Sequence, residues 1–168
     1  MICVKEKSVS KVLPIVTRRM ILREITEEDA EKIVELRKKP EIYKYFIYPH
    51  AITIEEHLEW YNKVYLQNEN RIDFMAVEKK SNKSIGVFGV CRQDSVSDVG
   101  EVSYILDPSY QGLGYASEAL GVLNEFIKKE WNCKKSMARI HMCNKESLHF
   151  IENQGYERDR FVTYYKDI

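Results

Sequence analysis

The amino-acid sequence predicts an α+β fold, or α/β sandwich, formed by a single domain over residues 1–168. Its 168 residues suffice for one well-packed core but not comfortably for two domains. Hydrophobic residues make up 44% of the chain and aromatic residues 11%, which excludes a disordered protein. Strand and helix patterns follow one another in the order β-α-α-β-β-β-α-β-α-β. This mixture predicts a sheet that is largely antiparallel in its front half.

The front of the chain predicts one strand and two helices. After an irregular lead-in over residues 1–14, apolar and charged residues alternate over residues 17–25, as in a half-buried strand. A hydroxyl followed three residues later by an acid predicts that a helix starts at Thr26 and runs to about Lys39. A second capping box at Thr53 starts the next helix.

The rest of the chain alternates between strand and helix patterns. Strands are predicted where apolar residues recur at every second position, and helices where they recur at three and four. In chain order, the expected elements are a hairpin (72–80 and 84–92), a strand (99–107), a long helix (112–131), a strand (135–143), a short helix from Asn144 to Gly155, and a final strand or hairpin (156–168).

The charge balance and the cysteines restrict the partners of the protein. Lys+Arg and Asp+Glu are equal at 26 each, so there is no electrostatic case for nucleic acid or an anionic membrane as the main partner. The four cysteines form no CxxC pair and no zinc-ligand spacing, which predicts reduced thiols and no metal site. The N-terminus lacks the apolar segment of a signal peptide, and no apolar run reaches the length of a membrane span. These observations favour a cytoplasmic protein.

The stretch YILDPSYQGLGYASEAL, from Tyr104 to Leu120, places two of the seven glycines between an apolar strand and a helix. A helix N-terminus leaves about four amides without intrahelical partners and carries roughly half a positive charge. Gly112 and Gly114 would let the backbone turn tightly and let a phosphate approach. The stretch lacks the Lys of a Walker loop and the third glycine of the dinucleotide fingerprint. It therefore predicts another kind of phosphate cradle, or a tight strand–helix turn whose glycines serve packing alone.

The residues around these glycines resemble motif A of the GCN5-related N-acetyltransferases (GNAT). In that motif a strand ends as in Leu-Asp-Pro of residues 106–108, and Gln111, Gly114 and Ala116 follow at the family spacing. Downstream, NKESLHFIENQGYE of residues 144–157 resembles the helix that follows the next strand in this family.

A third match lies at the front of the chain, so the resemblance spans residues 17–157 in family order. TRRMILREITEEDAEKI of residues 17–33 is similar to the opening strand and helix of the ribosomal-protein alanine acetyltransferase branch. The resemblance implies a GNAT fold, with a twisted, mostly antiparallel sheet, helices on both faces, and a splay between the strands 99–107 and 135–143. It also implies that acetyl-CoA is the acetyl donor and CoA a product.

The resemblance further implies how the coenzyme is held. Pantetheine would bond to the strand backbone from Ser103 to Leu106, and the amides of residues 111–116 would hold the pyrophosphate. Asn144 would contact the pantetheine arm, cap its own helix, or do both. The expected cofactor-binding residues are Ser103, Ile105, Leu106, Gln111, Gly112, Leu113, Gly114, Tyr115, Ala116, Ser117 and Asn144.

The reaction implied is direct attack of a primary amine on the thioester. Free alkylamines are mostly protonated at pH 7, so the site needs a base, directly or through water. Glu101, on the cofactor-binding strand, is the first candidate, and a plain surface carboxylate is the alternative. Relatives often carry a Tyr where this chain has Ile151. The acid for the leaving thiolate is therefore expected from Ser147 or Tyr104, with His141 as a further candidate, unless the thiolate leaves unaided.

The acceptor pocket is expected from the segment before the hairpin. Residues 35–61 resemble the corresponding stretch of the nucleotide-amino-sugar N-acetyltransferases of bacterial pseudaminic acid synthesis, although Leu36 replaces the usual Trp. An aromatic lid would stack on the acceptor, and Arg37 or Lys39 would meet a diphosphate. Alternatively, the aromatic residues only roof the core. The expected substrate-binding residues are Arg37, Tyr45, Phe46 and His57.

Other acceptors and one other class of protein stay open at this point. The acceptor is expected to be a small amine such as a nucleotide-linked amino sugar, with a ribosomal-protein N-terminus, a polyamine or an antibiotic as alternatives. The missing Tyr at Ile151 would also suit a non-catalytic CoA-binding scaffold. Both a monomer and a homodimer are compatible with the sequence.

Overall fold

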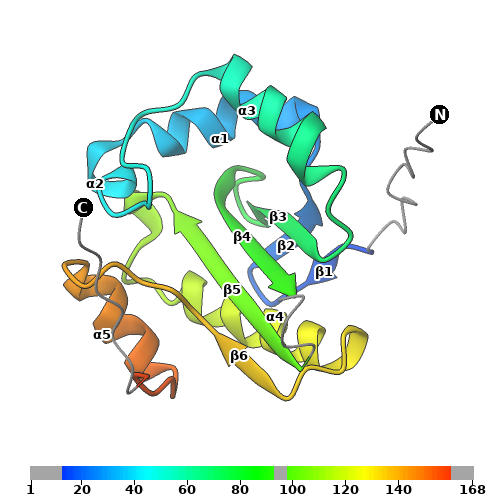
Figure 1. Ribbon diagram of the computed structural model, residues 1–168, viewed down its shortest axis with the longest axis vertical. Helices are drawn as coiled ribbons and strands as arrows, with labels where there is room; N and C mark the ends of the chain where they lie inside the picture. Colours follow the sequence, from blue (N-terminus) through cyan, green and yellow to red (C-terminus); the bar gives the residue numbers. More distant parts are fainter. Residues whose placement is uncertain (1–12, 93–97, 160–168) are drawn as a thin grey trace, which may run out of the picture.

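The computed structural model describes residues 13–92 and 98–159, and these residues form a six-stranded sheet flanked by helices (Figure 1). The strands lie side by side in chain order, antiparallel except for the last pair, β5 and β6, which is parallel. This arrangement confirms the predicted α+β class and the mostly antiparallel sheet. The strands are β1 (Ile15–Val16), β2 (Met20–Glu24), β3 (Arg71–Glu78), β4 (Ser84–Arg92), β5 (Val99–Leu106) and β6 (Lys135–Met137).

The helices are of several lengths and types. The α-helices are α1 (Ala30–Arg37), α2 (Pro40–Tyr43), α3 (Ile54–Trp60), α4 (Tyr115–Glu130) and α5 (Lys145–Asn153). Two 3-10 turns, η1 (Glu27–Asp29) and η3 (Pro108–Tyr110), precede α1 and the glycine turn, and a π-helical turn, η2 (Tyr61–Tyr65), extends α3. Among the described residues, no helix combines the length and the apolar character needed to cross a membrane.

Both predicted caps form in the front half of the chain. The amide of Thr26 donates to the Asp29 carboxylate at 2.9 Å, and Asp29 is also held by Arg23 at 2.7 Å. The hydroxyl of Thr53 accepts the Glu56 amide at 3.1 Å, and its own amide donates back to the Glu56 carboxylate at 2.8 Å. Because these bonds satisfy amides at the helix starts, the sequence signal and the observed starts agree.

The sheet separates two hydrophobic clusters, one on each face. On one face, α4 packs against the sheet through Leu120 and Leu123, and the fully buried Phe74 and Phe88 lie in the same cluster. On the other face, residues of α1 and η2, among them Ile33, cover the buried Met75. The alternation of side chains along β3 assigns neighbouring residues to opposite clusters, which confirms that helices cover both faces.

The sheet splays where β5 and β6 part. The two strands are paired only from Val99–Lys135 to Glu101–Met137, while β5 continues to Leu106. The chain after β6 runs away from β5 toward α5 (Figure 1). The predicted strand 135–143 is therefore wrong beyond Met137. Its alternating pattern favours a strand, but residues 138–143 form no ladder with any other part of the chain that the structure describes.

Other boundaries also need correction. The long helix begins at Tyr115 rather than at Gly112, because the glycines form the turn before it. Within the predicted final element 156–168, residues 156–159 form no strand, and residues 160–168 lie outside the described part of the chain. Most of the predicted lead-in, residues 1–12, also lies outside it.

Candidate active site

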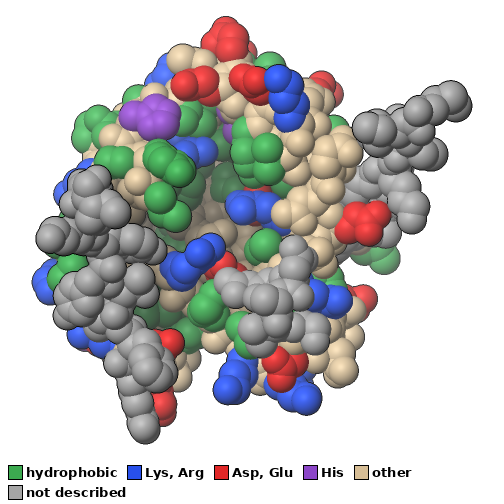
Figure 2. Space-filling view, viewed as in Figure 1, with side chains coloured by type: hydrophobic (Ala, Val, Ile, Leu, Met, Phe, Trp, Pro, Cys, Tyr) green, Lys and Arg blue, Asp and Glu red, His purple; other side chains and the backbone are tan. Residues whose placement is uncertain are grey.

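A cavity of about 1290 Å³ opens where the sheet splays, and its hollow lies near the centre of the face in Figure 2. Its wall combines β5, the glycine turn, the start of α5, and the segment from α1 to α3. This volume exceeds the roughly 300–1,000 Å³ of most small-molecule sites, so the cavity has room for an extended ligand and a second reactant. Of all the catalytic, cofactor-binding and substrate-binding residues expected from the sequence, every one except Leu113 lines this cavity.

The glycine turn has the backbone geometry that requires glycine. Gly112 has φ +70° and Gly114 has φ +82°, both in the left-handed region that other residues rarely adopt. Gly114 is the N-cap of this 16-residue helix, α4, and the residues from Gly114 to Ser117 line the cavity, so the amides without intrahelical partners lie at its wall. No atom lies within 4 Å of the position that a Cβ would take at Gly112. The turn therefore offers open space beside helix-end amides, as a phosphate cradle requires.

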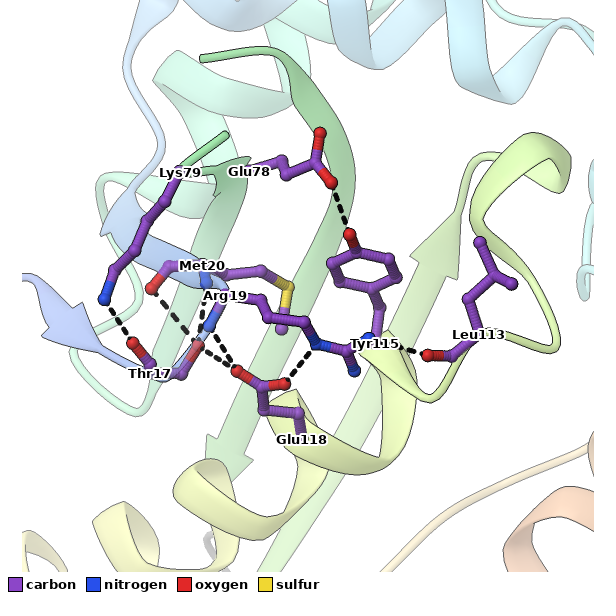
Figure 3. Close-up of polar contacts among 8 residues, drawn as sticks. All are labelled: Thr17, Arg19, Met20, Glu78, Lys79, Leu113, Tyr115 and Glu118. Carbon is purple, nitrogen blue, oxygen red and sulfur yellow. Dashed lines mark hydrogen bonds and ion pairs between the residues drawn. The ribbon is translucent and has the colours of Figure 1, made fainter. Parts of the chain in front are cut away.

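Arg19 clamps the outside of this turn to the N-terminal part of the sheet (Figure 3). Its guanidinium donates to the carbonyl of Leu113 at 2.8 Å and to the Glu118 carboxylate at 2.7 Å, and it stacks over the Tyr115 ring at 4.1 Å. Thr17 also donates to Glu118 at 2.7 Å. Leu113 thus contributes its carbonyl to the clamp, and its exposed side chain is not among those that line the cavity. Its expected part in cofactor binding stays a prediction.

The clamp makes a testable contribution to stability through Glu118. Burial opposes ionisation of this carboxyl, but hydrogen bonds from Thr17 and Arg19 outweigh burial and lower its pKa to about 2 from 4.5. A lowered folded-state pKa contributes stability above the unfolded pKa, and this contribution is lost as the pH falls from 4.5 toward 2. We expect Glu118→Gln to reduce the free energy of unfolding by about 2 kcal/mol at pH 7.

Urea unfolding at several pH values measures this difference. The gap between wild type and Glu118→Gln should narrow steadily below pH 4.5. Glu125→Gln is the matched control, because Glu125 lies on the same helix in an exposed ion pair with Lys129 and should change stability little. A loss for Glu118→Gln that stays constant with pH would contradict the ionic role of this carboxylate.

The exposed backbone edge of β5 is the second part of the site. Beyond Glu101, β5 has no pairing with β6, and the residues from Val102 to Leu106 line the cavity. An unpaired strand edge can bond an extended ligand as an added strand. At the end of β5, the Gln111 side chain donates to the carbonyl of Leu106 at 3.1 Å and so ties the glycine turn to the strand. The open edge and the phosphate cradle therefore lie in series along one wall.

Tyr104 and Ser147 meet at the start of α5. Their hydroxyl oxygens lie 2.6 Å apart, and Asn144, as the N-cap, accepts the Ser147 amide at 3.2 Å. Burial raises the pKa of Tyr104, so its phenol stays protonated at neutral pH. Ile151 is buried in the core and offers no polar group. The phenol that relatives carry on this helix is absent, but a phenol from β5 reaches the same helix start.

Glu101 faces the cavity in an ion pair with Arg139. Arg139 donates to the two carboxylate oxygens at 2.9 and 2.8 Å, and the Glu101 side chain is 15% exposed. The hydrogen bond to Glu101 raises the pKa of Arg139, which keeps the guanidinium charged. Ser103, two residues on, follows on the same face. A Cβ added to Gly89 would lie 2.7 Å from the Ser103 hydroxyl, so Gly89 keeps space open there.

Sequence reasoning missed a pair on β3 in the same cavity. Arg71 donates to the buried Asp73 at 2.9 Å, and both residues line the cavity. Asp73 lies in register with Gly89 and, through it, with Ser103. A buried acid in an otherwise apolar strand was the available signal, because burial of a carboxylate requires a partner.

The acceptor end of the cavity is built from α1, α3 and the loop after α2. Phe46 lies under the Arg37 guanidinium at 5.1 Å, and His57 packs against Trp60 with ring centroids 5.6 Å apart. Lys39, expected to meet a diphosphate, instead pairs with Asp107 at 2.9 Å. Arg37 lines the cavity and Lys39 does not. Of these two basic residues, Arg37 is therefore the one that reaches the acceptor end.

A glycine turn at a helix start, beside an open strand edge, has the geometry to hold an extended, phosphorylated ligand. The sequence model of the acetyltransferase (GNAT) domain matches residues 19–157, and the chain belongs to this family. Its members are acyltransferases that use acetyl-CoA. The residues fit this coenzyme, since the cradle leaves room for a pyrophosphate and the β5 edge leaves room for an extended arm.

Known relatives agree with the family assignment. The chain is 25% identical over 154 residues to the uncharacterized N-acetyltransferase p20 of Bacillus licheniformis, covering 89% of this chain and 85% of that protein. It is 26% identical over 144 residues to a Methanocaldococcus jannaschii protein, of which the chain spans only 29%, with 84% of the chain covered. The fold matches a Vibrio cholerae spermidine N-acetyltransferase solved with CoA and spermine, at TM-score 0.75, 21% identity, and 88% and 87% coverage of the two chains.

Proposed function

We propose that the protein acetylates the primary amine of a small molecule, with a nucleotide-linked amino sugar as the first candidate. The observation that supports this most is that one cavity joins the glycine cradle, the open β5 edge, two acid–base candidates and an aromatic acceptor end. The acceptor candidate rests on the resemblance of residues 35–61 to nucleotide-amino-sugar acetyltransferases. Tyr45 and Phe46, which line the cavity, are the aromatic residues placed to pack on a sugar or base.

The proposed mechanism has two proton transfers, one from the attacking amine nitrogen and one to the leaving thiolate sulfur. The amine nitrogen attacks the thioester carbonyl, so a C–N bond forms and the C–S bond breaks. Glu101, directly or through a water molecule, takes the proton that the attacking nitrogen loses. Tyr104, with Ser147 at 2.6 Å, gives a proton to the thiolate sulfur. Because the Tyr104 phenol is protonated at neutral pH, it is ready to donate before each turnover.

Tyr104→Phe tests the leaving-group acid. Removing the phenol should lower kcat about 10- to 100-fold, at the low end of general acid effects because a thiolate leaves more easily than an alkoxide or amide. The affinity for CoA should stay within about twofold. Stopped assays of thiol release, with CoA affinity measured by calorimetry, separate the two quantities.

Tyr156→Phe serves as the control for that experiment. Its hydroxyl bonds to Ser136 and Asn124, and the residue does not line the cavity. The Tyr156→Phe variant should lose these hydrogen bonds and keep the kcat of the wild type. Equal rates for wild type and Tyr104→Phe would remove Tyr104 from the mechanism and leave Ser147, or unaided departure of the thiolate.

A parallel assay of acceptors tests the proposed function. Acetyl-CoA turnover is read as free thiol with four amines: a UDP-amino sugar, a ribosomal peptide starting with Ala or Ser, spermidine and an aminoglycoside. We expect preferential turnover with the UDP-amino sugar. Preferential turnover with the peptide or with spermidine would instead support a ribosomal-protein N-terminus or a polyamine as the acceptor. CoA binding without acetyl transfer to any of them would favour a non-catalytic scaffold.

A further inference from the structure

A buried histidine without hydrogen-bond partners lines the acceptor end of the cavity. His57 is 2% exposed, and neither of its ring nitrogens has a hydrogen-bond partner among the described residues. Burial and the nearby Arg37 lower the pKa of His57, so the ring is neutral and keeps one N–H to donate. A buried polar group left without a partner is destabilising, and a ligand that accepts its N–H would remove that cost.

Arg37, beside this histidine, forms no ion pair with any described residue. Its Nε is buried and unpartnered, and its charge lies over the Phe46 ring at 5.1 Å. Burial and the like charge of Arg71 lower the pKa of Arg37. Among the described residues, the other two guanidinium groups of the cavity are paired, Arg71 with Asp73 and Arg139 with Glu101. The acceptor end therefore holds a positive charge that forms no ion pair within the described part of the chain, although Asp73 and Glu56 attract it from further away.

We propose that Arg37 and His57 together bind an anionic group, a carboxylate or a phosphate, carried by the acceptor amine. The guanidinium offers parallel N–H groups that match either oxyanion, and the His57 N–H supplies a further donor. This specificity rests on the proposed acetyltransferase function and narrows its acceptor to amines that also carry negative charge. A polyamine fits this end less well, because the buried Asp73 and the partly buried Glu101 of the cavity wall are already paired with arginines.

Direct binding of small anions tests the site without any turnover. The protein is first saturated with CoA, so that the phosphate cradle is filled, and is then titrated with inorganic phosphate or, separately, malonate. Trp60 is the fluorescent reporter, because it lies against His57 and under Arg71, and a Trp131→Phe background removes the other tryptophan of the chain. We expect a saturable change in fluorescence with at least one anion, and the stronger of the two identifies phosphate or carboxylate.

Matched variants decide whether Arg37 is responsible. Arg37→Gln should weaken the binding of the anion at least about tenfold, while Arg18→Gln, which removes an exposed charge outside the cavity, should leave it unchanged. His57→Asn, which keeps a donor, should bind more tightly than His57→Leu. Absence of a saturable change, or equal affinity in Arg37→Gln and wild type, would overturn the proposal.

A second measurement separates this inference from the proposed function. Thiol release is compared for glucosamine against glucosamine 6-phosphate and for tyramine against tyrosine, with spermidine alongside. The anionic member of a pair should have at least about tenfold higher kcat/KM, and Arg37→Gln should remove that advantage. Turnover that favours spermidine or the uncharged amines would overturn the anion site but leave the acetyltransferase. Anion binding without acetyl transfer to any amine would support the anion site and contradict the proposed acetyltransferase function.

Discussion

Gly114→Asp is expected to weaken CoA binding at least about 100-fold and to abolish acetyl transfer with it. The backbone at Gly114 has φ +82°, so any side chain strains the turn. The added Cβ would lie 3.3 Å from a nitrogen of the Arg19 guanidinium, on the outside of the turn. The new carboxylate would also stand beside the amides that are proposed to hold a pyrophosphate, and like charges repel. Calorimetric titration with CoA measures the effect directly.

Gly155→Asp distinguishes loss of the cradle from loss of the fold. Gly155 closes α5 at φ +84° with no atom within 4 Å of an added Cβ, and it does not line the cavity. The substitution therefore imposes a similar backbone strain away from the proposed phosphate. It should lower stability by roughly 1 kcal/mol and leave CoA affinity unchanged. If Gly114→Asp bound CoA as tightly as Gly155→Asp, the pyrophosphate would have to lie elsewhere.

Glu101→Gln is expected to lower kcat about 100-fold or more at neutral pH, with CoA affinity retained. The amide keeps the size of the side chain but cannot accept a proton from the amine. Because free alkylamines lose their own proton near pH 10, the deficit should shrink as the pH rises toward that value. A pH profile of kcat for wild type and variant, with the best acceptor found, measures both the size of the loss and its recovery.

Two further variants make the test of Glu101 specific. Glu146→Gln removes an exposed carboxylate from the first turn of α5, also on the cavity wall, and should change kcat little. Asp73→Asn removes the buried carboxylate on β3, which also lines the cavity. A full rate in Glu101→Gln together with a large loss in Asp73→Asn would assign the base to β3 instead of β5.

The sequence predicted those parts of the fold and site that depend on local chemistry. The caps at Thr26 and Thr53 and the turn at Gly112 and Gly114 each need a particular residue at a particular place, so they could be recognised from single residues. Glu101 was expected in the site from the family resemblance, and it lines the cavity. The expected positions of the site residues therefore agree with the cavity wall, while their roles stay predictions.

The parts that could not be predicted depend on residues far apart in the chain. The register of three strands brings Asp73 and Ser103 to the two sides of Gly89, and register is set by pairing rather than by any one strand. The end of β6 at Met137 could not be predicted for the same reason, since whether residues that suit a strand form one depends on pairing with residues elsewhere in the chain. Arg19 and Glu118 are in contact although they lie 99 positions apart in the chain, and local sequence patterns do not predict such contacts.

That last contact also bears on how the protein reaches its working state. Closing a loop of this length costs more conformational entropy than forming a local helix or hairpin. We therefore expect this contact to form after those local elements. Arg19, directly before β2, bonds to the glycine turn at Leu113 and to α4 at Glu118, so it joins the cradle to the N-terminal part of the sheet. By linkage, a coenzyme that binds the finished cradle stabilises the docked N-terminal strand as well. The supply of acetyl-CoA would thereby influence how much of the newly made chain stays folded, in addition to its rate of turnover.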